Sequence, residues 1–148
     1  MIDKNNRLIV ALDVPDSDSA KKLVDILGLE VNFYKIGLEL MMSGDYFELI
    51  KWLKGRGKKV FCDLKLYDIS QTVARAVKNL AQYDVDLLTI HAASHDIMLR
   101  AAENKSKMQV VAVTVLTNLD RQDLLEMGFN PNISLEEFNS RPDNYLDS

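Results

Sequence analysis

The fold of this chain is decided by one run of residues, Val60-Phe61-Cys62-Asp63-Leu64-Lys65-Leu66-Tyr67-Asp68-Ile69. The run begins as an apolar β-strand and becomes charged toward its end. Because side chains on a strand alternate between two faces, we expect Asp63 and Lys65 to share one face and the apolar side chains between them to share the other. Asp68 follows directly, before a helix for which Ser70 is a suitable N-cap. The run therefore predicts a strand that packs one face on helices and carries an acid and a base on the other.

Charges at the end of a single strand usually mark an exit into water, since exposed ion pairs are common and contribute little. The rest of the chain argues against that interpretation here. Five apolar runs have the length of strands, and four of them are rich in Val, Ile or Leu on both faces, which is typical of a buried parallel sheet. The five runs are Leu8–Leu12, Asn32–Leu38, Lys59–Leu64, Asp86–His91 and Gln109–Leu116. Segments with apolar residues at helical spacing lie between them.

The alternation of strand and helix repeats about every 25 residues, close to one unit of a (β/α)8 barrel. A doubly wound open sheet has the same rhythm, but it normally carries a glycine-rich turn after the first strand when it binds a nucleotide. Here the first strand is followed by Asp13-Val14-Pro15-Asp16, which contains no glycine. We therefore expect an α/β fold with parallel strands, a partial (β/α)8 TIM barrel of about five of the eight units.

Composition limits the possible functions. The 148 residues suit one compact domain, and 47% apolar residues are enough for a core. The net charge of −4, without a basic cluster, argues against nucleic acid as a partner. Cys62 is the only cysteine, so no disulfide can form within the chain. Residues 1–7 are polar and Leu8–Leu12 is too short for a signal peptide or a membrane span, so we expect a cytoplasmic protein with no membrane partner.

Each expected strand places a polar or charged residue at or near its end. In order along the chain these residues are Asp13, Lys35, Asp63 with Lys65, His91 and Thr117. Active sites of (β/α)8 barrels lie at the carboxyl ends of the strands, so we expect these side chains to meet there. A single histidine such as His91 is more often structural, but the same feature on five strands indicates a site.

The chemistry that the sequence offers is alternating lysine and aspartate. There is no Cys/His cluster with metal-binding spacing, no serine elbow and no glycine-rich phosphate loop. Carboxylates keep neighbouring lysines protonated. An ammonium beside a carbon that loses an anionic group can stabilise the carbanion and then protonate it. Decarboxylation without a cofactor has these needs, although an aldolase or an isomerase can use similar parts.

A known family has the same residues at the same spacing. The run Asp63-Leu64-Lys65-Leu66-Tyr67-Asp68-Ile69-Ser70-Gln71-Thr72-Val73 closely resembles the signature of the orotidine 5′-phosphate decarboxylases, Asp-x-Lys-x-x-Asp-Ile followed by Pro or Gly and then x-Thr. Four further segments resemble the family's strands in the same order: Leu8–Asp13, Tyr34–Gly37, Ile90–Ala92 and Val113–Thr117. The resemblance ends near Phe138. We therefore expect residues 1–138 to form the partial barrel and 139–148 to be a polar tail outside the family pattern.

The resemblance implies roles for the charged residues. Lys65 would donate a proton to C6 of the pyrimidine, and Asp63 would lie beside the substrate carboxylate. Lys35 and Asp68 would complete a Lys-Asp-Lys-Asp array, with Asp68 contributed across a homodimer interface.

The resemblance also implies how the substrate is held. Asp13 and Thr72 would contact the ribose or neighbouring atoms, and Thr117 would contact the pyrimidine. No cofactor or metal would be used, and the product would be UMP, the end of pyrimidine biosynthesis.

Two alternatives remain open. The 3-keto-L-gulonate 6-phosphate decarboxylases share the barrel and the Asp-x-Lys-x-x-Asp signature, but they typically carry an acid at the position of Lys35 and use magnesium. Lys35, Ile69 and Thr72 together favour the orotidine enzymes. The family closes eight strands and this chain supplies five, so we expect weak or no activity from the truncated chain. The second alternative is a non-catalytic remnant, or a fragment that needs a partner.

Overall fold

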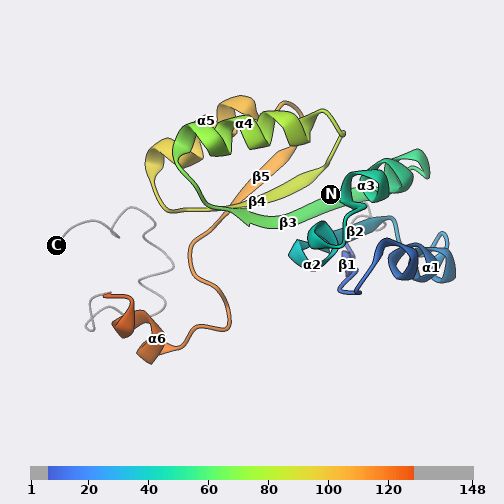
Figure 1. Ribbon diagram of the computed structural model, residues 1–148, viewed down its shortest axis with the longest axis horizontal. Helices are drawn as coiled ribbons and strands as arrows, with labels where there is room; N and C mark the ends of the chain where they lie inside the picture. The colour runs from blue at the N-terminus through green and yellow to red at the C-terminus, as the bar shows by residue number, and fades with distance from the viewer. Residues whose placement is uncertain (1–6, 129–148) are drawn as a thin grey trace.

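The computed structural model describes residues 7–128, which form one parallel five-stranded sheet with helices between the strands (Figure 1). The strands lie side by side in their order along the chain. They are β1 (Val10–Ala11), β2 (Phe33–Gly37), β3 (Lys59–Leu66), β4 (Leu87–His91) and β5 (Gln109–Val113). The helices are α1 (Ser17–Leu27), α2 (Leu38–Met42), α3 (Tyr46–Gly55), α4 (Ser70–Ala81), α5 (His95–Asn104) and α6 (Arg121–Glu126). This succession is that of the first five units of a TIM barrel, which confirms the expected fold class.

The two outer strands are shorter than the sequence predicts. β1 pairs with β2 only at Val10 and Ala11. β5 ends at Val113, whose carbonyl accepts a hydrogen bond from the backbone N–H of Ala92 just past the end of β4. Apolar composition shows that a segment can be buried, but a strand continues only as far as its neighbour offers backbone partners. The short helices α2 and α6 are also elements that the sequence pattern did not predict.

The core lies between one face of the sheet and the helices. Figure 1 shows α4 and α5 lying along the same side of β3, β4 and β5. Alternate residues of the central strands are fully buried on this side: Tyr34, Ile36, Val60, Cys62 and Leu88. The helices contribute Leu49, Ile50, Leu53, Val73 and Val77 to the same cluster. Each such side chain stabilises the fold by roughly 1.5–3 kcal/mol relative to exposure, so this layer is what holds the strands in place.

Cys62 belongs to this core. Burial raises the pKa of its thiol to about 12, so the side chain stays protonated and packs as a small apolar group. The single cysteine therefore lies on the face of the sheet that packs against the helices.

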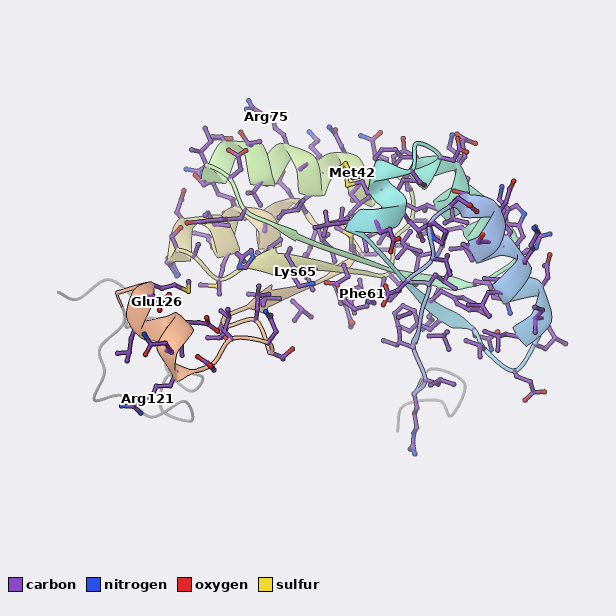
Figure 2. All side chains as sticks on the ribbon, turned by 60° about the horizontal axis from the view of Figure 1, so that its bottom comes forward. Met42, Phe61, Lys65, Arg75, Arg121 and Glu126 are labelled. Atoms are coloured by element: carbon purple, nitrogen blue, oxygen red, sulfur yellow. The ribbon has the colours of Figure 1, made fainter. Side chains whose placement is uncertain are left out.

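The opposite face of the sheet remains partly accessible. Lys35, Phe61 and Asp63 are half-buried there, and Val111 is 49% exposed. Figure 2 shows Lys65 and Phe61 on the side of the sheet away from α4, whose Arg75 points outward. In a closed barrel this face is the interior, and polar groups on it lie at the mouth when they come from the carboxyl ends of the strands.

The start of α4 differs from the sequence prediction. Ser70 is the first helical residue, and the N-cap is Ile69, in an extended conformation and without a side-chain cap. The backbone N–H groups of Thr72 and Val73 donate to the carbonyl of Ile69. Because Ser70 already lies inside the first turn, the prediction that it is the N-cap is wrong.

Candidate active site at the carboxyl ends of the strands

Four alternating charges form a continuous row at the carboxyl ends of β1, β2 and β3. Nζ of Lys35 lies 3.0 Å from Oδ1 of Asp13 and 3.6 Å from Oδ2 of Asp63. Nζ of Lys65 lies 2.7 Å from Oδ1 of Asp63. The structure therefore brings together four of the residues that the sequence singles out. We call Asp13, Lys35, Asp63 and Lys65 the ionic row.

The strand register explains why the row forms. Lys35 is paired with Phe61, and Gly37 with Asp63, in the parallel ladder between β2 and β3. Paired positions point to the same face, so Lys35 and Asp63 lie diagonally across neighbouring strands. At Gly37 the lysine amine occupies nearby space, since a Cβ built there would lie 3.9 Å from Nζ of Lys35. Alternation along each strand thus directs both groups toward one place.

Asp63 is the electrostatic centre of the row. Its side chain is 16% exposed, whereas that of Asp13 is 66% exposed. Burial alone would raise the pKa of Asp63, but hydrogen bonds from Lys65 and Thr89 and the charges of Lys65 and Lys35 outweigh it. The pKa of Asp63 therefore lies below its ordinary value, and the carboxylate is charged at neutral pH.

Lys65 lies in an irregular part of β3. Cys62 pairs with Leu88 and Leu66 with Ile90, so β3 has two more residues than β4 over the same stretch. Lys65 has φ 47°, a left-handed conformation that is uncommon for a residue with a Cβ. Such bulges occur next to active sites, where they redirect a side chain. Burial nevertheless alternates along β3 as far as Lys65, whose ammonium keeps its contact with Asp63.

Thr89 is a residue of the site that the sequence reasoning missed. Its hydroxyl donates to Oδ1 of Asp63 at 2.9 Å and accepts from the backbone N–H of Lys65 at 3.0 Å. The side chain is buried in the middle of β4. One signal was available in the sequence, because Thr89 lies two residues before His91 and therefore shares its strand face.

Three other predicted residues lie outside the ionic row. Asp68 is exposed, and its Oδ1 accepts a hydrogen bond from the backbone N–H of Ile69 at 2.6 Å. In residues 7–128 no ion pair joins Asp68 to a lysine of the same chain. Thr72 is half-buried in the first turn of α4, and Thr117 is exposed beyond the end of β5. The predicted roles of these three residues stay predictions.

His91 lies beside the row, at the end of β4. Its ring and that of Tyr67 have centroids 5.5 Å apart. Both rings line a mostly apolar cavity of about 290 Å³, which also includes Thr114 from beyond β5 and Leu124 from α6. Tyr67 follows Lys65 by two residues along the chain, and none of the four residues of the ionic row lines the cavity. An uncharged, partly apolar part of a substrate could be accommodated there.

The sequence signature and the ionic row agree with a known family. The sequence profile of the orotidine 5′-phosphate decarboxylase / HUMPS family matches residues 6–138. The chain belongs to this family. The segment 129–138 of the match, and the expected polar tail 139–148, lie outside the residues that the structure describes.

Known relatives have the same fold and greater length. The orotidine 5′-phosphate decarboxylase of Methylococcus capsulatus is 55% identical over 124 residues, which are 84% of this chain and 51% of that protein. The crystal structure of orotidine 5′-phosphate decarboxylase from Lactobacillus acidophilus superposes with a TM-score of 0.76 at 31% identity, covering 88% of this chain and 62% of the other. The Methanocaldococcus jannaschii enzyme complexed with the inhibitor BMP gives 0.65 at 32% identity, covering 72% and 51%. The chain thus spans about half the length of the curated relatives it matches.

Two further structural findings concern the described part of the chain. None of its helices has the length and apolar character needed to cross a bilayer. Within residues 7–128, no group of three or more His, Cys, Asp or Glu side chains is placed to hold a metal ion.

Proposed function

We propose that this chain carries the acid–base groups of an orotidine 5′-phosphate decarboxylase, which forms UMP in pyrimidine biosynthesis. The observation that carries the proposal is the ionic row, in which each lysine lies within 3.6 Å of a carboxylate. Family membership and the names of the relatives support the same activity. Lys35 on the second strand favours it over the activity of the sugar-phosphate enzymes of this family.

The row is suited to removing a carboxylate and replacing it with a proton. In the proposed reaction the bond between C6 of the pyrimidine and the carboxylate carbon breaks, carbon dioxide leaves, and the electron pair stays on C6. Asp63 lies beside the departing carboxylate, and the ammonium of Lys65 stabilises the charge that develops on C6. Lys65 then donates its proton to C6 and recovers one from solvent. Lys35 helps to keep Asp63 ionised throughout.

The remaining predicted residues belong to the same proposal. Asp68 would serve the site of a second subunit in a homodimer, and its exposure beyond β3 makes it available for such a contact. Asp13 and Thr72 would contact the ribose or neighbouring atoms, and Thr117 the pyrimidine. No cofactor takes part in this scheme, and the cytoplasm is the proposed location.

The number of β/α units present affects how much activity is expected from the 148 residues alone. The described residues supply five strands, and a closed barrel of this class has eight. Binding energy from parts of the substrate remote from the reacting carbon contributes to lowering the barrier, so missing contacts reduce turnover as well as affinity. We therefore propose that catalysis needs further β/α units of the family. The second candidate is a non-catalytic remnant, or a fragment that needs a partner.

A chimera tests the proposal. It joins residues 1–128 to the C-terminal part of the Methylococcus capsulatus relative that lies beyond the match. We expect the chimera to consume orotidine 5′-phosphate, which is measured as a loss of the orotate absorbance. We expect the 148-residue chain to show little or no turnover. Lys51→Ala is a matched control, because Lys51 pairs with Glu48 on the exposed side of α3, and it should leave the rate unchanged.

Each outcome of this experiment has a defined meaning. A folded chimera without turnover contradicts the proposed function of the ionic row. Rapid turnover by the 148-residue chain contradicts the need for additional strands.

A further inference from the structure

Thr89 makes two hydrogen bonds that join the backbone of Lys65 to the side chain of Asp63. Its side chain comes from β4, whereas Asp63 and Lys65 are both on β3. Oγ1 of Thr89 lies 3.0 Å from N of Lys65 and 2.9 Å from Oδ1 of Asp63. The same Oδ1 lies 2.7 Å from Nζ of Lys65. Thr89 therefore closes a ring of hydrogen bonds that contains both the backbone and the ammonium of Lys65.

The chemistry of the groups fixes the direction of each bond in the ring. A backbone N–H can only donate and an ionised carboxylate can only accept, whereas a hydroxyl has one proton to give and lone pairs to accept with. Thr89 therefore accepts from Lys65 and donates to Asp63. Valine, which has nearly the same shape, can do neither.

The ring holds a conformation that the chain would otherwise avoid. Lys65 has φ 47°, and a left-handed residue with a Cβ costs roughly 1–2 kcal/mol. The bulge between Cys62 and Leu66 leaves the N–H of Lys65 bonded to a side chain, the hydroxyl of Thr89. Thr89 itself is only 5% exposed, so an unpaired N–H facing it would be poorly hydrated. The hydroxyl thus compensates for the irregular backbone at the position where Lys65 is directed into the row.

We propose that Thr89 is the positioning residue of the ionic row. Thr89 fixes the bulge at Lys65 and orients the carboxylate of Asp63, so that one oxygen faces Lys65 and the other faces Lys35. The catalytic consequence of this role rests on the proposed function, but the positioning itself does not. It can be measured in the 148-residue chain without any turnover.

The test compares Thr89→Val, Thr89→Ser and Thr114→Val by NMR in the 148-residue chain. Thr114→Val is the matched control, since Thr114 is a half-buried threonine beyond the neighbouring strand β5. In Thr89→Val we expect the pKa of Asp63 to rise, because one of the hydrogen bonds that lower it is lost. We also expect the amide hydrogen of Lys65 to exchange about tenfold faster, the size expected for one hydrogen bond. Thr89→Ser keeps the hydroxyl and should restore both values toward those of the wild type.

The readouts separate positioning from a general structural role. A general loss of packing would accelerate amide exchange throughout β3 and β4, and Thr89→Ser would not reverse it. If any threonine-to-valine change loosened the sheet, the control Thr114→Val would show the same acceleration. If Thr89→Val does not fold, Thr89→Ala offers the same readouts with a smaller side chain. An unchanged pKa of Asp63 and unchanged exchange at Lys65 in the folded variant would overturn the proposal.

The catalytic part is tested separately in the chimera. Thr89→Val should lower kcat about tenfold, with a smaller change in KM, and Thr89→Ser should recover most of the rate. A chimera without any turnover contradicts the proposed function but leaves the NMR result on Thr89 standing. An active chimera whose kcat is insensitive to Thr89→Val contradicts the catalytic consequence of the positioning.

Discussion

Lysine and aspartate meet at both ends of this sheet, and the two clusters use their charges differently. At the amino ends, Nζ of Lys54 lies 2.7 Å from Oδ2 of Asp86, which also accepts a hydrogen bond from the backbone N–H of Val60 at 2.9 Å. Nearby, the buried Lys58 donates to the carbonyls of Gly28 and Val31 at 2.6 and 2.8 Å. These charged groups satisfy backbone atoms where helices and strands begin and end.

At the carboxyl ends the charges are directed mainly at one another. Asp13, Lys35, Asp63 and Lys65 are joined by side-chain contacts, and the backbone enters only at Lys65 through Thr89. A group that satisfies the backbone stabilises the fold, whereas a group that keeps a neighbour charged is available for chemistry. The comparison therefore supports the proposal that the amino-end cluster contributes stability and the ionic row catalysis, the division that is general for this class of barrel.

The largest expected difference between the two clusters is in catalysis. Lys35→Ala in the chimera should lower kcat/KM about 10²–10³-fold, because it removes a fixed charge from the site and weakens the ionisation of Asp63. Lys54→Ala, at the other end of the sheet, should reduce the free energy of unfolding and leave kcat/KM within a few-fold. Steady-state kinetics on both variants check this. Equal losses of activity in the two folded variants would contradict the assignment of roles.

For stability we expect a smaller effect, and here the amino-end cluster matters more than the ionic row. Lys58→Met leaves the carbonyls of Gly28 and Val31 without their partner and should lower the free energy of unfolding by about 1–3 kcal/mol. Urea unfolding of the 148-residue chain measures the change. Lys51→Met is the control, because Lys51 is exposed and its substitution should change stability by less than about 0.5 kcal/mol. A Lys58→Met chain as stable as the control would show that these hydrogen bonds contribute nothing.

The smallest expected effect is the pH dependence of the free energy of unfolding that Asp63 contributes. Because the pKa of Asp63 is lowered in the folded chain, its ionisation stabilises the fold above the ordinary aspartate pKa of about 3.9. This contribution is lost as the pH falls through the lower, folded-state value. The difference in free energy of unfolding between wild type and Asp63→Asn should therefore be greatest near neutral pH and shrink below about pH 4. A difference in free energy of unfolding that stays constant down to strongly acidic pH would contradict the lowered pKa of Asp63. Asp25→Asn serves as the control, because Asp25 belongs to an exposed ion pair with Arg56.

Two simple rules sufficed to predict that Asp13, Lys35, Asp63 and Lys65 cluster at one edge of the sheet. The pairing of Asp13 with Lys35 was not predicted, because the expected array ended in Asp68. Period-two alternation places Asp63 on the accessible face of β3, and parallel strands bring the carboxyl ends of β1, β2 and β3 to the same edge. The expected barrel order of the five strands followed from the same spacing and is confirmed. Local pattern was enough wherever the strands are regular and neighbouring strands run parallel.

Features that depend on an irregular register between two strands could not be predicted. The bulge at Lys65 follows from the register between β3 and β4, and neither strand's sequence specifies it alone. Thr89 was missed for the same reason, since its hydroxyl matters only because the bulge leaves the N–H of Lys65 facing it. The N-cap of α4 was misplaced by one residue because Ser70 has good capping chemistry but lies inside the helix. Cross-strand register and backbone conformation thus account for the main errors.

The most direct test of the central claim is the rate of carbon dioxide release by the chimera with Lys65→Ala, measured beside Lys54→Ala. In the proposed mechanism Lys65 is the proton donor, so its removal should lower the rate by about 10²–10⁴-fold or more, whereas Lys54→Ala should retain it. That result would assign the chemistry to the carboxyl-end row. Release of carbon dioxide from the Lys65→Ala chimera at the unmodified rate would contradict the account.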